Sequence, residues 1–355
     1  MALDIFSTHT LLMGIEQITP PKTFLRDRYF PTNEATDIFA TNEVLIEYKD
    51  GSKKLAPFVA PRKGGVTIAR QGYKMDRFRP PFIAPRRVLT IDDLSKRGFG
   101  EAFLTTLTPE ARQAAMLMRD MQELTELIIR REEAMAAETL INNKCVLFEI
   151  ADDLKKGEEK EIVFYEGSSN PATYTPSTKW NASGAKIIDD IYAMAKELKK
   201  RGLAVADLIV APDVAALIIN DDTIQKMLDI RNYDLGGVQP AELPNGATKI
   251  ARLNVYGAMI DVISYDETYE ADDGTIKQYI PAGYVVLTAP NAGRTLYGAV
   301  SQVEQADGAV HTYKGRRIPK YYSDAQDDIR TITLKSCPLL IPNNVNPWIT
   351  AKVTV

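Results

Sequence analysis

The segment from Leu55 to Thr90 constrains the fold more than any other part of this sequence, because it can form neither a long helix nor a core of its own. Five prolines and three glycines interrupt it, and each proline fixes φ and removes a backbone donor. The segment still contains aromatic and β-branched residues such as Phe58, Ile68 and Phe82, which disordered linkers generally lack. We therefore expect an ordered basic arm that lies on another subunit, rather than a disordered linker. The residues expected at that intersubunit interface are Arg62, Lys63, Arg70, Lys74, Arg77, Arg79, Phe82, Arg86 and Arg87.

The charge of the basic arm, residues 55–90, is opposite to that of the rest of the chain. The arm holds 8 of the 43 basic residues and 1 of the 47 acidic residues, which leaves the remainder with 35 basic residues, 46 acidic residues and a net charge of −11. Because opposite charges favour association, a neighbouring copy of the same acidic body is the expected partner. Nucleic acid is the alternative partner for a basic stretch, but the arm matches no known nucleic-acid-binding module.

The strongest helical pattern runs from Thr108 to about Asn143. Thr108 suits the N-cap position and Pro109 the first helical position. At 1.5 Å per residue the helix would be about 50 Å long. We expect it to pack on a sheet, with a coiled coil as the alternative. Its predicted apolar stripe is Ala114, Leu117, Met121, Leu124, Ile128 and Met135, with Arg112, Arg119, Glu126 and Glu133 on other faces.

Further elements follow from caps, turns and alternating β-formers. Ser183 is expected to cap a helix over 184–201 that Gly202 ends, and Asp50-Gly51 to form a hairpin turn after a strand over 44–48. Other helices are predicted at 7–17, 212–219 and 222–231. Strands are predicted at 145–150, 161–165, 207–211, 258–264, 277–280, 284–288 and 295–300, and within 329–341 and 348–355.

The sequence offers no pattern for catalysis or cofactor binding. It lacks the motifs for a nucleophile elbow, a phosphate loop, a dinucleotide site and a zinc protease. The two histidines lie far apart, and the two cysteines, Cys145 and Cys337, read as buried free thiols. Acidic clusters near 152–159 and 266–274 lack the ligand spacing of a calcium loop, so we interpret them as hairpin tips. We therefore expect no enzyme activity, no cofactor and no metal.

Targeting segments are not predicted either. The first residues lack the basic region of a secretory signal. The longest apolar run, 208–219, contains Pro212 and Asp213 and is too short to span a bilayer. Cytosolic synthesis without a membrane partner is the expectation.

Seven stretches across the chain resemble one known family. They are FLRDRYFP at 24–31, TNEVLIEY at 41–48, LAPFVAPRKGG at 55–65, PFIAPRRVLT at 81–90, IPAGYVVL at 280–287, TLYGAV at 295–300 and CPLLIPNNVNPWITAKV at 337–353. In this order and spacing they are similar to the lambda-like major capsid protein E family of tailed phages. The resemblance implies an α+β fold of the Hong Kong ninety-seven type. The implied divisions are an N-terminal arm at 1–43, an extended loop at 44–95, a peripheral domain with a long spine helix at 96–182, an axial domain at 183–300, and strands returning to the peripheral domain at 301–355.

The same resemblance implies a structural role. The chain would be a major capsid protein that self-assembles into pentamers and hexamers of an icosahedral phage head around double-stranded DNA, which it would contact without sequence specificity. Scaffolding, portal and decoration proteins are the further partners implied. The implied location is the virion capsid, with assembly in the host cytoplasm. The alternatives are a nanocompartment shell protein of the same fold and a hydrolase that uses scattered carboxylates.

Overall fold

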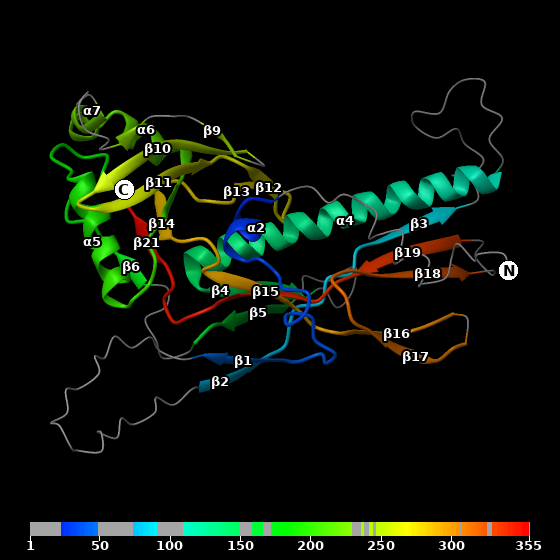
Figure 1. Ribbon diagram of the computed structural model, residues 1–355. Coiled ribbons are helices and arrows are strands. Elements are labelled where there is room, and N and C mark those ends of the chain that lie inside the picture. Colours follow the sequence, from blue (N-terminus) through cyan, green and yellow to red (C-terminus); the bar gives the residue numbers. More distant parts are fainter. Residues whose placement is uncertain are drawn as a thin grey trace, which may run out of the picture.

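One long helix sets the shape of the molecule (Figure 1). Helix α4, Pro109–Asn142, extends from a large sheet at one end along a smaller sheet at the other. The helix predicted over 108–143 is therefore confirmed. The computed structural model describes residues 23–48, 74–90, 109–149, 158–165, 172–228, 236–237, 241–243, 246–305, 307–324 and 329–354.

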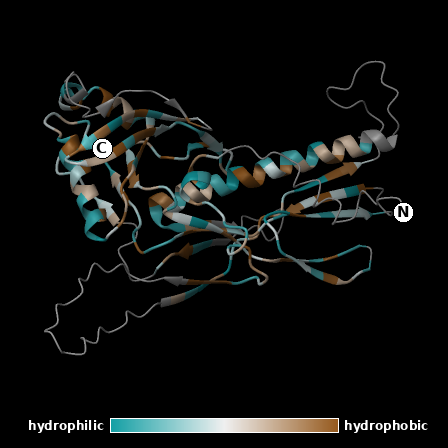
Figure 2. Cartoon of the chain, in the orientation of Figure 1, coloured by the Kyte–Doolittle hydropathy of each residue, from teal (hydrophilic) through white to brown (hydrophobic). Residues whose placement is uncertain are grey.

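The smaller sheet packs against α4 through matching apolar faces. Its strand order is β18 (Ile318–Asp324), β19 (Ile329–Lys335) and β3 (Arg86–Thr90), all antiparallel. Ile332 and Leu334 of β19 lie two residues apart, so both point to the helix side of the sheet. Their buried partners on α4 are Leu117, Met121, Leu124 and Ile128, and Figure 2 shows hydrophobic and hydrophilic residues alternating along this helix. The prediction that α4 packs on a sheet is confirmed.

The large sheet has eight strands drawn from distant parts of the chain. The central strand β7, with the sequence DLIV, is buried along its whole length. It pairs in parallel with β11 and antiparallel with β14. Helix α5 lies beside β10, and α6 beside β11. The strand order is β6 (Ala172–Tyr174), β21 (Ile349–Lys352), β14 (Tyr284–Thr288), β7 (Asp207–Val210), β11 (Ala258–Tyr265), β10 (Ala247–Val255) and β8 (Gly236–Gly237), with β9 (Ala241–Glu242) also pairing with β10.

Shorter elements surround these two sheets. Helix α2, Leu25–Tyr29, lies across α4 near the large sheet (Figure 1). The remaining helices are α5 (Ile187–Lys200), α6 (Pro212–Ile219) and α7 (Asp222–Leu228). The antiparallel strand pairs are β1 (Val44–Tyr48) with β2 (Lys74–Phe78), β4 (Lys144–Glu149) with β5 (Glu158–Val163), β12 (Thr268–Glu270) with β13 (Ile276–Gln278), β15 (Gly293–Tyr297) with β20 (Pro338–Pro342), and β16 (Val300–Val303) with β17 (Val310–Tyr313).

Some predicted boundaries differ from the structure. Helix α5 begins at Ile187, with Lys186 and not Ser183 at its N-cap, because Gly184 has φ of 83°, which no helical residue adopts. Gly202, with φ of 81°, ends the helix as predicted. The strand expected over 295–300 is two strands, since β15 ends at Tyr297 and β16 begins at Val300. Strands β2, β3, β6, β8, β9, β10, β12, β17 and β18 have no predicted counterpart, and the helix expected at 7–17 lies outside the described residues.

Within the part of the chain that the structure describes, no helix combines the length and the apolar character that crossing a membrane requires.

Candidate interaction surface and the junction that supports it

The predicted interface residues do not form one group in the structure. Arg62, Lys63 and Arg70 lie outside the described residues. Lys74 and Arg77 are in β2, Arg79 and Phe82 follow that strand, and Arg86 and Arg87 are in β3. The basic arm therefore includes two strands of different sheets, β2 and β3.

The base of the arm is the strand pair β1–β2. Val44 and Ile46 of β1 are buried, and Phe78 of β2 packs edge to face on Phe164 with ring centroids 5.5 Å apart. Side chains alternate along a strand, so Leu45 and Arg77 face the other way, and Leu45 is 48% exposed. Arg77 pairs with Glu43 at 3.1 Å on this exposed side. One face of the pair thus anchors the arm, and the other is available for contact.

The partner of β1 differs from the expectation. The register pairs Val44 with Phe78 and Tyr48 with Lys74, so the antiparallel partner comes after residues 49–73. A tight turn at Asp50-Gly51 does not connect this strand pair. The turn itself lies outside the residues that the structure describes.

The end of the arm packs on its own chain. Arg87 lies opposite Ile332 in the β3–β19 register, which places its side chain on the α4 side of the sheet. There it pairs with Glu123 and, at 3.8 Å, with Asp120. Pro80 and Pro81 are also buried. This part of the arm therefore contacts β19 and α4 of its own chain. The expectation that 55–90 also lies on another subunit stays a prediction. Arg86 and the 58%-exposed Phe82 remain on the surface.

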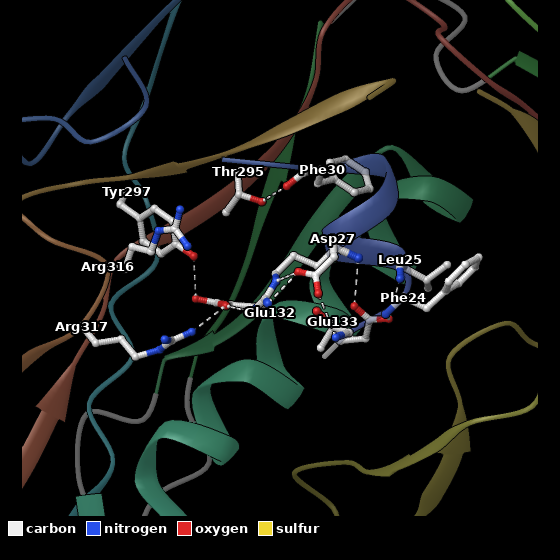
Figure 3. A network of polar contacts seen from close by, with 12 residues as sticks. Phe24, Leu25, Asp27, Phe30, Glu132, Glu133, Thr295, Tyr297, Arg316 and Arg317 are labelled. Atoms are coloured by element: carbon white, nitrogen blue, oxygen red, sulfur yellow. Dashed lines mark hydrogen bonds and ion pairs between the residues drawn. The ribbon is translucent and has the colours of Figure 1, made fainter. Parts of the chain in front are cut away.

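A buried carboxylate on α4 holds α2 in place (Figure 3). Glu133 is 1% exposed. It accepts the backbone N–H groups of Phe24, Leu25 and Arg26 at 3.1, 2.7 and 2.9 Å, and the Tyr265 hydroxyl donates to it at 2.9 Å. Burial raises the pKa of Glu133, and these hydrogen bonds act in the opposite direction. The first N–H groups of a helix have no partner inside the helix, so Glu133 supplies the acceptor that α2 lacks.

The neighbouring Glu132 contacts α2 as well, and two further segments. Arg26 pairs with it at 2.6 Å, Tyr297 of β15 donates to it at 3.0 Å, and Arg317 lies 3.5 Å away. Glu132 is completely buried. A buried carboxylate is tolerated where ion pairs and hydrogen bonds satisfy it. Burial also raises the pKa of the Tyr297 hydroxyl, with the Glu132 charge acting in the same direction.

The same short segment also reaches the large sheet. Arg28 forms a two-point ion pair with Asp207 of β7, with nitrogen to oxygen distances of 2.6 and 3.0 Å, and the Tyr29 hydroxyl donates to Asp207 at 3.0 Å. Phe30 packs on Trp348 with ring centroids 5.7 Å apart. Residues 23–31, which we name the strap, therefore tie α4 to the large sheet.

The geometry of the strap indicates a structural role. Glu132 and Glu133 both accept hydrogen bonds from hydroxyl, guanidinium or backbone N–H groups of the same chain, and Glu132 also forms ion pairs with arginines. These partners occupy the two carboxylates, so neither is free to bind a substrate. Across the described segments, no group of three or more His, Cys, Asp or Glu side chains is arranged to hold a metal ion.

Sequence reasoning missed this junction. We expected Glu133 on a charged face of α4, but its neighbours one turn away, Ile129, Ala136 and Ala137, are all buried. That helical spacing was the available signal. In the stretch FLRDRYFP, the two arginines Arg26 and Arg28 are the residues that pair with α4 and β7.

Comparisons with known proteins agree with this fold. The family described as phage major capsid protein E matches residues 7–353. The major capsid protein of Enterobacteria phage P21 is 22% identical over 99% of this chain and 100% of its own length. That of Escherichia phage lambda is 22% identical over 85% of this chain and 86% of its own. A crystal structure described as the capsid protein of an Escherichia coli CFT073 prophage superposes with a TM-score of 0.66 at 16% identity, covering 98% of this chain and 99% of that one.

Proposed function

This chain belongs to the phage major capsid protein E family, and we propose that its copies associate as pentamers and hexamers into an icosahedral head around double-stranded DNA. Membership of the family makes the chain a phage major capsid protein, a structural subunit of an oligomeric capsid. The family match over residues 7–353 is the observation that carries the proposal, since it includes the strap, the arm and both sheets.

The divisions of the subunit follow from the same premise. We propose an N-terminal arm at 1–43, an extended loop at 44–95, a peripheral domain with α4 as its spine at 96–182, an axial domain at 183–300 and returning strands at 301–355. We also assign β21 at 349–352 and β6 at 172–174 to the proposed axial part, because β21 pairs with both β14 and β6 in the large sheet.

The proposed work of the subunit is contact area rather than chemistry. The family is structural, and the two α4 carboxylates that contact the strap, Glu132 and Glu133, are engaged by other groups of the chain. The proposed further partners are scaffolding, portal and decoration proteins, with assembly in the host cytoplasm. Contact with DNA would be weak and without sequence preference, because a net negative chain does not concentrate phosphate.

Electron microscopy of the purified, expressed protein tests the proposal. Closed shells of uniform size with fivefold and sixfold clusters are the expected result, either alone or with an added scaffolding protein. The unassembled subunit should also bind duplex DNA only weakly at physiological salt. A protein that stays monomeric under all such conditions, or that binds DNA with submicromolar affinity, contradicts the proposal.

A further inference from the structure

The hairpin turn between β10 and β11 holds an unexpected residue. Tyr256 and Gly257 connect the paired residues Val255 and Ala258, with φ of 46° and 86°. Two-residue turns with both φ values positive strongly favour Asn-Gly. A bulky side chain in the left-handed region is strained, and such strain is often tied to function.

The strained tyrosine is exposed and also fixed in position. Its side chain is 65% exposed, yet its hydroxyl donates to Asp189 at 3.1 Å. Its ring packs edge to face on Tyr192 of α5, with centroids 4.9 Å apart and planes at 71°. Tyr192 is itself 37% exposed. Two aromatic rings are thus ordered at the surface of the subunit.

Preordered tyrosines are well suited to binding another protein. A side chain that is already fixed loses little conformational entropy when a partner covers it. Tyrosine is also enriched among the residues that dominate the binding energy of interfaces. Within the isolated subunit the backbone conformation at Tyr256 is unfavourable for a tyrosine, whereas an asparagine at 256 would suit it. The turn itself is supported by the Gly257 N–H, which donates to the Asn254 side chain at 2.9 Å.

We propose that the Tyr192–Tyr256 pair is a contact for a second copy of this chain. The second copy is the expected occupant because members of this family act as oligomeric capsid subunits. The inference rests on the proposed assembly and deepens it by naming the residues that meet a neighbour. Burial of both rings against a neighbouring copy would explain why the chain has a tyrosine at a position where its backbone is strained and its ring is exposed in the isolated subunit.

Labelling of tyrosines in the wild-type protein is the first test. Hydroxyl radicals, read out by mass spectrometry, should modify Tyr256 readily in the dissociated subunit and severalfold less in assembled shells. Tyr192 should be protected in parallel. Equal labelling of Tyr256 in subunits and shells contradicts the contact, whereas a wild-type chain that never forms shells overturns the proposed function and the contact together.

A matched pair of substitutions is the second test. Tyr256→Asn removes the ring but suits the turn, and it should raise the subunit concentration needed for assembly by about tenfold or more. Tyr256→Phe keeps the ring and should stay within about threefold of the wild type. Unassembled Tyr256→Asn protein should unfold at a temperature no more than about 3 °C below the wild type.

A second variant, which leaves the β10–β11 turn unchanged, separates loss of the contact from misfolding of the turn. Tyr192→Ala should weaken assembly in the same direction as Tyr256→Asn, because it removes the other half of the pair. If the folded Tyr256→Asn and Tyr192→Ala proteins both assemble at the wild-type concentration, the proposed contact is wrong.

Discussion

The carboxylate of Glu133 lies 2.7 Å from the backbone nitrogen of Leu25, although 108 positions separate the two residues in the chain. Three consecutive N–H groups at the start of α2 end on this one side chain. A helix of five residues is not stable by its own propensity. Helix α2 therefore depends on α4 for its hydrogen bonds, and α4 depends on α2 to satisfy a buried charge.

Removing this acceptor should destabilise the subunit strongly. Glu133→Ala leaves three backbone donors and the Tyr265 hydroxyl without their partner, which should lower the free energy of unfolding by about 3 kcal/mol or more. Urea denaturation of the unassembled protein measures the loss. Glu126→Ala is the control, since Glu126 is on the same helix and forms a surface pair with Arg130, and it should cost less than about 0.5 kcal/mol. Equal losses for both variants would contradict the role given to Glu133.

Lysine should not replace arginine at position 28. The guanidinium of Arg28 reaches both oxygens of the buried Asp207, and an ammonium cannot reproduce this two-point geometry. Arg28→Lys should therefore cost about 1–3 kcal/mol of stability. The same substitution at Arg77, whose pair with Glu43 is exposed, should cost less than about 0.5 kcal/mol. Thermal unfolding of the two variants side by side checks the difference.

Gly293 should not tolerate a side chain. A methyl group added there would overlap the ring of Phe30 and the carbonyl oxygen of Ile341. Gly293→Ala should destabilise the subunit by about 1–3 kcal/mol through overpacking. Adding Phe30→Leu should recover part of the loss, because it makes room at the same place. A double variant no more stable than expected from the two separate losses would show that the two sites are not coupled.

The two thiols should be unreactive in the folded protein. Burial raises the pKa of Cys145 to about 12 and that of Cys337 to about 11. Since only the thiolate attacks an alkylating agent, both residues stay protonated and covered at pH 8. Iodoacetamide followed by mass spectrometry should label neither in the native subunit and both after denaturation. Rapid labelling of either cysteine in the native state is the contrary outcome.

The central part of the basic arm should serve assembly rather than subunit stability. Replacing residues 51–73 by a short Gly/Ser bridge removes Arg62, Lys63 and Arg70 but keeps β1, β2 and β3. The shortened protein should still unfold cooperatively, yet form no shells under the electron microscope. Changing the same three cations to Gln keeps the length, and it should weaken assembly less at high salt, where charge contacts are screened. Normal shells from the shortened protein would show that this segment is not an interface.

Periodicity predicted the elements that have one clear face. The stripe of α4 and the buried run of β7 were both readable, because apolar spacing of three to four residues or a continuous apolar strand has few alternatives. The positions of Pro212, Gly202 and Gly274 likewise fixed starts and turns, since backbone φ limits those residues.

Contacts between distant segments could not be read in the same way. The sequence shows that Glu132 and Glu133 are charged, but not that Arg26, Tyr297 and the start of α2 lie within reach. The strand β18 was missed because Pro319 and Lys320, residue types that are depleted in strands, directly follow its first residue, Ile318. The prediction treated the basic arm as a single segment. The position of Arg87 depends instead on the pairing of β3 with β19, which the sequence does not show.

The place of β21 in the large sheet links folding to protein synthesis. This strand lies between β6 and β14. The ribosome must therefore translate the chain through residue 352 before β6 can join the large sheet through β21. A chain interrupted before residue 349 leaves the sheet divided. A product truncated before this strand therefore lacks a complete large sheet.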